Sequence, residues 1–163
     1  MKSILFVCTG NIFRSMVAEY VLKAAMGPSP LYRAGSAGTG ARPQPVSPLV
    51  RSRLLARGID PGGHQQRRVT AELLAETDLV VAMGLDHRAF LEEHFGQQSR
   101  LFNQICTGQE TAVLDVWEAV PDWRENEQAG QSYTVSVVDH IREAMPTFLK
   151  NVERYLPREG SSD

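Results

Sequence analysis

The chain has 163 residues, which fits one domain that can bury a core of its own. Apolar residues make up 42% and charged residues 22%, close to the composition of an ordinary soluble globular protein. The formal net charge of −2 gives no general basic field that would attract nucleic acid or a membrane surface, so any anion site must be local.

We expect neither a signal peptide nor a membrane span. The first apolar run, residues 4–7, is too short for either, and no apolar stretch of about 18 residues occurs elsewhere. The two cysteines, Cys8 and Cys106, imply no disulfide framework. We therefore expect a reduced, cytoplasmic protein, with one domain over residues 1–157 and a polar tail over residues 158–163.

The first predicted element is a buried strand. Residues 4–7 form the continuous apolar run Ile-Leu-Phe-Val, which is typical of a parallel strand covered on both faces. Residues 15–26 then show the apolar spacing of a helix, and Gly27 ends it. Residues 31–34 are a second short strand, which a glycine-rich loop ends.

Helices and strands alternate through the middle of the chain. Residues 46–57 are expected to be helical, and Thr70 is the expected N-cap of the next helix. Residues 79–83 form the clearest buried strand, and residues 86–95 return to a helix that ends at Gly96.

The last third of the chain contains a weak strand, a long loop and a final helix. The strand covers residues 100–102, and residues 103–131 are expected to be mostly loop. Apolar residues at spacings of three and four predict a helix over residues 135–155, with Pro146 kinking or dividing it. The alternation of strands and helices predicts an α/β fold with a mainly parallel sheet, whose sites lie beyond the carboxyl ends of the strands.

Cys8 and Arg14 flank five residues between the first strand and the first helix. The backbone N–H groups of such a loop can form a concave nest for an anion, to which the helix N-terminus adds partial positive charge. Gly10 and Asn11 tolerate the left-handed conformations that a nest requires. Arg14 supplies a planar fork that matches two phosphate oxygens. The loop therefore predicts a phosphate site.

The same surroundings favour the thiolate form of Cys8, which is the nucleophilic form. We predict covalent phosphoryl transfer through a cysteinyl phosphate, with the Ser15 hydroxyl donating to the sulfur and helping the thiolate to leave. The alternative is an inert, buried cysteine followed by an ordinary turn. A Walker-type loop is excluded because the Gly-Lys-Ser/Thr ending is absent.

The segment Val-Cys-Thr-Gly-Asn-Ile-Phe-Arg-Ser over residues 7–15 closely resembles the signature of low-molecular-weight protein-tyrosine phosphatases. Similar segments follow in the family's order: Ala18-Glu19, Ser36-Ala37-Gly38-Thr39, Gly63-His64 with Arg67 and Thr70, the strand ending at Met83, and Val120-Pro121-Asp122-Trp123. The resemblance implies a three-layer α/β sandwich with a four-stranded parallel sheet, no metal or other cofactor, and hydrolysis of phosphotyrosine-like monoesters. Its expected partners are a phosphotyrosine-containing protein or a small aryl phosphate, and phosphate-like oxyanions as inhibitors.

The resemblance also assigns roles to single residues. It implies that the substrate-binding loop consists of Thr9, Gly10, Asn11, Ile12, Phe13 and Ser15. Asn11 would stabilise the loop, and Ser36 and His64 would lie behind it as hydrogen-bonding partners. The alternatives are a turn residue for Ser36 and a surface histidine for His64.

The leaving-group oxygen needs a proton, which a carboxylic acid near the loop can supply. The family places this acid in an Asp-Pro-aromatic motif. Here Asp122 is followed directly by Trp123, and Pro121 precedes it. We predict Asp122 as the acid and Trp123 as a pocket wall, with a solvated loop aspartate as the alternative and Asp115 as the reserve candidate.

Two other functions stay open. An arsenate reductase has the same fold and loop but needs further cysteines, and only Cys106 remains, in a distant segment. A phosphoprotein-binding module would keep the loop and lose the chemistry, which the altered segment around Asp122 allows. The natural substrate, whether phosphotyrosine, phosphoarginine or a small phosphoester, stays open as well.

Overall fold

Strand β1 (Ser3–Cys8) lies in the middle of the sheet, and all six of its side chains are buried. The computed structural model describes residues 1–158. In it, β1 pairs with β2 (Arg33–Gly38) and β3 (Leu79–Ala82), and β4 (Arg100–Leu101) completes the order β2-β1-β3-β4. Every pairing is parallel, which confirms the predicted α/β fold with a four-stranded parallel sheet.

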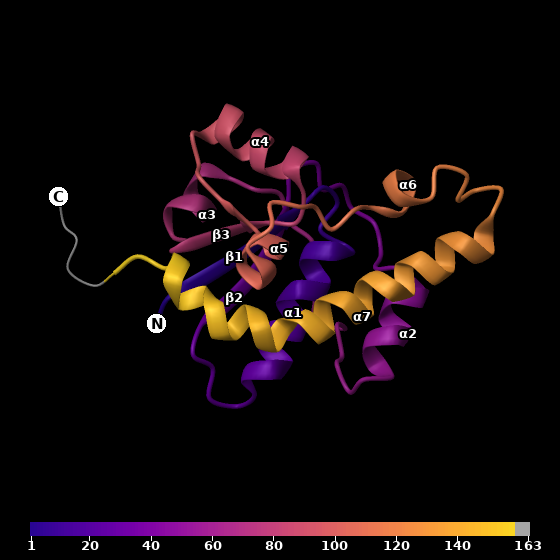
Figure 1. Cartoon of the computed structure of the whole chain (residues 1–163), viewed down its shortest axis with the longest axis horizontal. Helices are drawn as coiled ribbons and strands as arrows, with labels where there is room; N and C mark the ends of the chain where they lie inside the picture. Colours follow the sequence, from indigo (N-terminus) through magenta and orange to yellow (C-terminus); the bar gives the residue numbers. More distant parts are fainter. Residues whose placement is uncertain (159–163) are drawn as a thin grey trace.

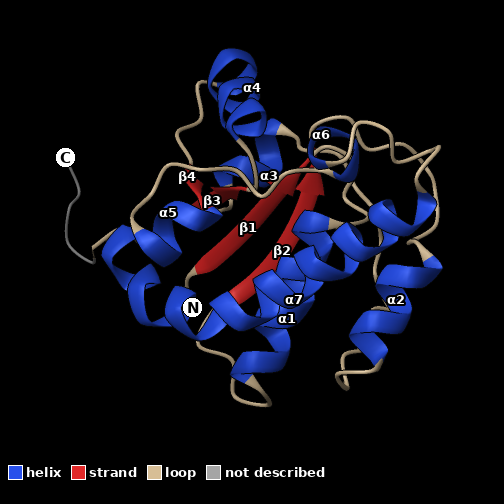
Figure 2. Cartoon of the chain, turned by 45° about the vertical axis from the view of Figure 1, so that its right-hand side comes forward, coloured by secondary structure: helices blue, strands red, loops and turns tan. Residues whose placement is uncertain are grey.

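Helices cover both faces of the sheet, giving the expected three layers (Figure 1, Figure 2). One face packs against α1 (Arg14–Met26), α2 (Pro48–Leu55), α5 (Phe102–Thr107) and α7 (Glu127–Asn151). The opposite face packs against the shorter helices α3 (Ala71–Ala75) and α4 (Leu85–Phe95).

The two cores divide the side chains of β1 by alternation. Ile4, Phe6 and Cys8 belong to the larger core beside α1 and α7, and Leu5 and Val7 belong to the smaller one. Successive side chains of a strand point to opposite faces, so β1 supplies both cores at once. This alternation places the Cys8 sulfur on the α1 side of the sheet.

The prediction for the second strand was wrong in position. Strand β2 runs over Arg33–Gly38, so the segment expected to be a glycine-rich loop is paired with β1. The glycines there serve close approach rather than a turn. A Cβ on Gly35 would lie 2.8 Å from Nη2 of Arg67, and a Cβ on Gly38 would lie 2.4 Å from the carbonyl oxygen of Thr9.

Residues 103–131 contain more helix than predicted. Helix α5 occupies the segment after β4, α6 (Val116–Ala119) forms a short turn of helix, and α7 already begins at Glu127. Pro146 lies inside α7 and does not divide it, and a 3-10 helix over Val152–Tyr155 follows. The apolar face of α7 continues past Pro146 to the buried Phe148, so packing against the sheet holds the helix together across the proline.

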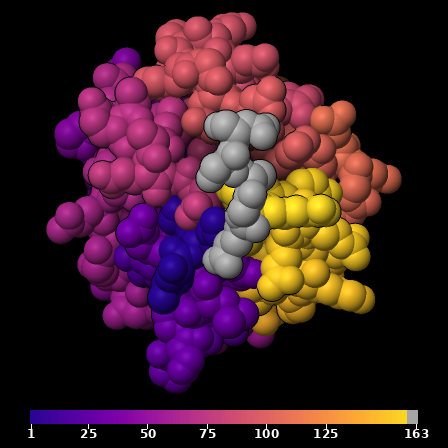
Figure 3. Space-filling view, turned by 90° about the vertical axis from the view of Figure 1, so that its left-hand side faces the viewer, coloured from indigo at the N-terminus to yellow at the C-terminus, as the bar shows by residue number. Residues whose placement is uncertain are grey.

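The N-terminal residues and the end of the described chain appear on the same face of the molecule (Figure 3). The predicted tail over residues 158–163 lies, apart from Arg158, outside the described residues. Over residues 1–158, no helix combines the length and the apolar character needed to cross a membrane.

Candidate active site

The loop between β1 and α1 is held from behind by two other segments. Thr39 N–H donates to the carbonyl of Cys8 at 2.9 Å, and Gly40 N–H donates to that of Thr9 at 3.0 Å. From the other segment, the Gln66 side-chain amide donates to the carbonyl of Gly10 at 2.5 Å. With its carbonyls bound on the outside, the loop can turn N–H groups inward, as a nest requires.

Asn11 is the residue on which the shape of the loop depends. Its φ of 55° is the only positive value at a residue other than glycine within residues 1–158. Its Oδ1 accepts from the backbone N–H of Arg67 at 3.0 Å, and its Nδ2 donates to Ser15 Oγ at 3.0 Å and to Ser36 Oγ at 2.8 Å. These three bonds hold a conformation that asparagine tolerates better than most residues do. The stabilising role of Asn11 stays a prediction.

Ser15 contacts the sulfur of Cys8. Their Oγ and Sγ atoms lie 2.9 Å apart, and both side chains are buried. Because Ser15 Oγ accepts a hydrogen from Asn11, its own hydrogen is free to be donated to the sulfur. That donation stabilises a thiolate on Cys8.

Ser36 and His64 both lie behind the loop. Ser36 donates to Oε2 of the buried Glu19 at 2.5 Å, and Glu19 also forms an ion pair with Lys23. The His64 ring contacts the carbonyl oxygen of Asn11 through Nε2 at 2.6 Å. Since a carbonyl only accepts, this nitrogen carries the hydrogen. Ser36 is buried within β2, and His64 is half-buried.

Arg14 begins α1 and is only 2% exposed. Its Nη1 donates to the carbonyl of Val113 at 2.9 Å, and its Nη2 donates to Oδ2 of Asp115 at 3.0 Å. Glu118 adds a second carboxylate at 3.8 Å. A guanidinium has five N–H donors, so these contacts fix the plane of the fork and leave donors for a phosphoryl group.

Asp115 is positioned by the short helix α6, of which it is the N-cap. Its Oδ1 accepts from the N–H of Val116 at 2.7 Å, and its own N–H donates to Oε1 of Glu118 at 2.9 Å, which together make a capping box. One carboxylate oxygen thus caps the helix and the other meets Arg14. The Asp115 side chain is 24% exposed, so it faces both the arginine and solvent.

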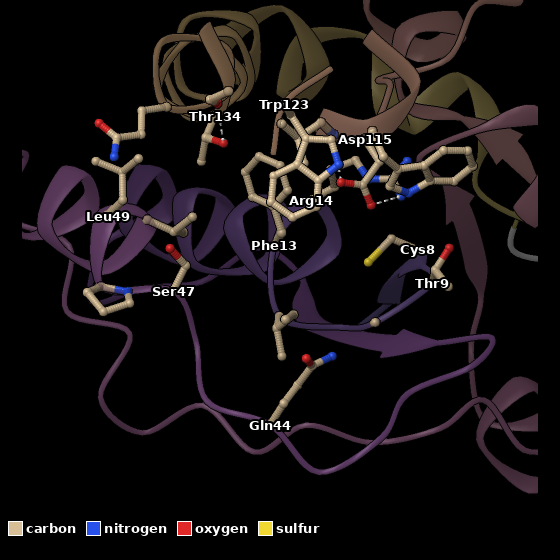
Figure 4. A pocket seen from close by; sticks show the side chains of 18 of the residues that line it. Cys8, Thr9, Phe13, Arg14, Gln44, Ser47, Leu49, Asp115, Trp123 and Thr134 are labelled. Carbon is tan, nitrogen blue, oxygen red and sulfur yellow. Dashed lines mark hydrogen bonds and ion pairs between the residues drawn. The ribbon is translucent and has the colours of Figure 1, made fainter. Parts of the chain in front are cut away.

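Cys8, Arg14 and Asp115 line one cavity of about 890 Å³. Figure 4 shows Cys8 and Thr9 at one end, Phe13, Trp123 and Asp115 in the middle, and Leu49 with Thr134 toward the other end. The loop and the start of α2 form one wall, and α6 and α7 form the other. The volume is at the upper end of the range for small-molecule sites.

A family model described as low molecular weight phosphotyrosine protein phosphatase matches residues 3–158. The chain belongs to this family. Curated relatives include the low molecular weight protein-tyrosine-phosphatase Ptp of Acinetobacter johnsonii, 36% identical over 56% of this chain, and Etp of Escherichia coli K12, 36% identical over 54%. The alignments span 63% and 58% of those relatives, which is less than two thirds of their length.

Solved structures of the family superimpose over nearly the whole chain. A YwlE mutant from Bacillus subtilis is 26% identical with a TM-score of 0.78, covering 94% of this chain and 99% of its own. Wzb of Vibrio vulnificus, solved in complex with benzylphosphonate, is 25% identical with a TM-score of 0.70, covering 91% and 97%.

The structure does not bring Asp122, the predicted acid, to the phosphatase loop. Asp122 is exposed and does not line the cavity, and its backbone carbonyl accepts from the N–H groups of Glu125 and Asn126 in the turn before α7. Asp115, the reserve candidate, lies in the cavity beside Arg14. Asp122 was chosen from the sequence because Trp123 follows it directly. The segment Asp115-Val116-Trp117, however, has the family's spacing of one residue between the aspartate and the aromatic residue.

Aromatic side chains form part of the cavity wall. Trp123, Phe13 and Ile12 line the cavity. The exposed Trp117 lines it as well, although the sequence analysis did not name this residue. Arg124 stacks over the ring of Trp123 with its Cζ 5.3 Å from the centroid. The aromatic walls therefore come from α1's N-terminal end and from the segment between α6 and α7.

His87 is a site residue that sequence reasoning missed. It lies in α4, is 1% exposed, and its Nε2 contacts Oγ1 of Thr9 at 2.9 Å. Burial, and next the positive charge of Arg14, lower the pKa of His87 from 6.5 to about 4. The only signal in the sequence was a histidine shortly after the clearest buried strand.

Cys106 lies apart from the site. It is buried in α5, its Sγ is 3.8 Å from the carbonyl oxygen of Ala144, and it does not line the cavity. Burial raises the pKa of the Cys106 thiol to about 12. Over the part of the chain that the structure describes, no three His, Cys, Asp or Glu side chains group together as metal ligands would.

Proposed function

We propose that the chain is a cysteine-dependent phosphatase that hydrolyses phosphate monoesters through a cysteinyl-phosphate intermediate. One observation carries the proposal: Cys8, Arg14 and Asp115 line one cavity, together with the loop between β1 and α1. A nucleophile, an anion clamp and a proton donor are what covalent phosphoryl transfer needs.

In the first step, the Cys8 thiolate attacks phosphorus and a sulfur–phosphorus bond forms while the bond to the leaving-group oxygen breaks. Arg14 and the loop N–H groups bind the phosphoryl oxygens and neutralise their charge. The Ser15 hydroxyl lies 2.9 Å from the sulfur and donates a hydrogen bond to it, which helps the sulfur to leave phosphorus in the second step.

Asp115 is the residue that we assign as general acid, in place of Asp122. Its position beside Arg14 and on the cavity wall supports the assignment. In the first step Asp115 donates a proton to the leaving-group oxygen as the bond from that oxygen to phosphorus breaks. In the second step Asp115 accepts a proton from the attacking water, and the sulfur–phosphorus bond breaks.

The shape of the cavity supports an aromatic leaving group. Phe13, Trp117 and Trp123 line the same cavity as Cys8, and flat rings suit a tyrosine or another aryl phosphate. A family neighbour of 26% identity is the YwlE arginine phosphatase, so phosphoarginine is the second substrate to be compared. The predicted cytoplasmic location stays a prediction.

The first test is hydrolysis of para-nitrophenyl phosphate by the wild type and by Cys8→Ser. We expect turnover in the wild type and its loss in the variant, which should still bind vanadate because Arg14 and the loop are intact. Turnover in Cys8→Ser within about tenfold of the wild type would refute the covalent mechanism. A wild type that binds vanadate without any turnover would identify a phosphoprotein-binding module instead.

The acid is tested by varying the leaving group. Asp115→Asn should slow phosphotyrosine hydrolysis by about 10²–10⁴-fold and should affect an activated aryl phosphate far less, because an acidic phenol departs without a proton. Asparagine keeps an oxygen that can cap α6, so the local structure survives. Asp122→Asn is the matched control, for which we expect no dependence on the leaving group.

Burst kinetics must accompany this comparison, because the leaving group has already departed if breakdown of the cysteinyl phosphate limits turnover. Strong leaving-group dependence in Asp122→Asn, with none in Asp115→Asn, would return the acid to Asp122.

A further inference from the structure

The buried pair formed by Thr9 and His87 is unexplained by the mechanism so far. Thr9 is the residue after the nucleophile and lines the cavity beside Cys8 (Figure 4). Its Oγ1 lies 2.9 Å from Nε2 of His87, which reaches the loop from α4 on the other side of the sheet.

The direction of this hydrogen bond follows from the other ring nitrogen. Nδ1 of His87 is buried and has no hydrogen-bond partner among the described residues. A neutral imidazole carries one hydrogen, and an unpaired buried N–H is rarer in proteins than an unpaired acceptor. The hydrogen therefore belongs on Nε2, with the bare lone pair on Nδ1.

The charged neighbours of His87 support the same tautomer. Oδ2 of Asp86 lies 3.5 Å from Nε2, and a carboxylate favours a hydrogen on the nitrogen that it faces. Burial, and next the charge of Arg14, lower the pKa of His87, whereas Asp86 and Asp115 raise it. The pKa of His87 is about 4 as a result, so the ring is neutral near pH 7. His87 thus donates from Nε2 to Thr9 Oγ1.

The consequence concerns the hydrogen of Thr9. Because Oγ1 accepts from His87, the hydroxyl hydrogen is free to be donated elsewhere. We propose that the Thr9 hydroxyl donates a hydrogen bond to the bound phosphoryl group, and that His87 is the positioning residue that keeps it in this role. The proposal rests on the phosphatase function above and adds a side-chain donor to the loop's N–H groups and Arg14.

The test measures vanadate affinity directly, by calorimetry, and kcat and KM for para-nitrophenyl phosphate in parallel. Thr9→Val keeps the shape and removes the hydroxyl, and we expect about 10–100-fold weaker vanadate binding, the usual effect of losing a hydrogen bond to a charged group. Thr9→Ser should bind vanadate nearly as the wild type does. Thr9→Val with wild-type affinity would overturn the proposal.

His87 is tested by two substitutions whose side-chain amides lie at different distances from the backbone. The side-chain amide of His87→Gln can take the place of Nε2, whereas that of His87→Asn takes the place of Nδ1 and cannot reach Thr9. We expect His87→Asn to weaken vanadate binding and His87→Gln to restore most of it. Thermal unfolding of each variant separates this effect from a purely structural one, which would lower stability and leave affinity unchanged.

The double variant Thr9→Val/His87→Asn should bind vanadate no more weakly than Thr9→Val alone, because His87 acts only through the hydroxyl. Additive losses would show two independent roles and overturn the proposal.

The control is His94→Asn, at an exposed position near the end of the same helix, which should leave vanadate affinity unchanged. A wild type that binds vanadate without hydrolysing the ester would refute the proposed function while the Thr9 comparison remains decisive, and one that does not bind vanadate would refute both.

Discussion

His87 should make the stability of the protein depend on pH in a way that one substitution removes. Its pKa is lowered to about 4 in the folded chain, against 6.5 for an unperturbed histidine. Between about pH 6.5 and pH 4 the unfolded chain therefore binds a proton that the folded chain does not. The free energy of unfolding is unaffected above this range and falls as the pH drops from about 6.5 to about 4.

The size of the effect follows from the two pKa values. At pH 5 the unfolded histidine is almost fully protonated and the folded one is largely neutral, which lowers the free energy of unfolding by about 2 kcal/mol relative to pH 7.5. The full loss, reached below pH 4, is about 3 kcal/mol. His87 is almost completely buried, so solvent screening reduces this little.

The assay is urea denaturation at pH 7.5 and pH 5.0, followed by tryptophan fluorescence, for the wild type and His87→Gln. Glutamine does not titrate, so the pH dependence of His87→Gln should be weaker than that of the wild type by about 2 kcal/mol, whatever the other groups contribute. His94→Gln, at an exposed position of the same helix, should keep the wild-type dependence. Equal pH dependence in the wild type and His87→Gln would refute the reasoning.

Further outcomes concern Arg14, the two cysteines and the independence from metal ions. Arg14→Lys should lower kcat/KM by about 10²-fold or more, because an ammonium cannot replace the planar fork that binds two oxygens, and steady-state kinetics with vanadate inhibition will measure it. Iodoacetamide near pH 7 should alkylate Cys8 and spare Cys106, whose pKa is raised to about 12, and Cys106→Ala should leave phosphatase turnover nearly unchanged; arsenate reduction that depends on Cys106 would instead indicate a reductase. Activity should survive treatment with a chelator, and a loss that added divalent metal restores would show a metal requirement.

The sequence predicted the parts of the site that depend on local pattern. The apolar run of β1, the loop residues and the start of α1 lie next to one another in the chain, and their chemistry follows from that order. The same is true of Thr70, whose Oγ1 accepts from the N–H of Leu73 at 3.2 Å as an N-cap should. These features needed no knowledge of distant contacts.

The features that the sequence did not predict depend on distant partners. Gly35 and Gly38 were interpreted as loop residues, although both pair with β1 in a strand. They are glycines because the Arg67 side chain and the loop backbone approach them closely. Asp115 was only the reserve candidate, because its role depends on Arg14, 101 residues away in the chain. His87 was missed because a buried histidine cannot be told from an exposed one by its neighbours in sequence.

Because side chains alternate along β1, the face on which the Cys8 sulfur lies depends on the number of residues in the strand before it. Ile4, Phe6 and Cys8 occupy even steps of the strand and face α1, whereas Leu5 and Val7 face the opposite core. One residue inserted within β1 would turn the sulfur, or else the whole apolar set before it, to the wrong side of the sheet. Two inserted residues would restore both faces at the cost of a longer strand. The chain should therefore tolerate insertions or deletions in β1 only when they add or remove two residues. No single substitution in the loop would reveal this constraint.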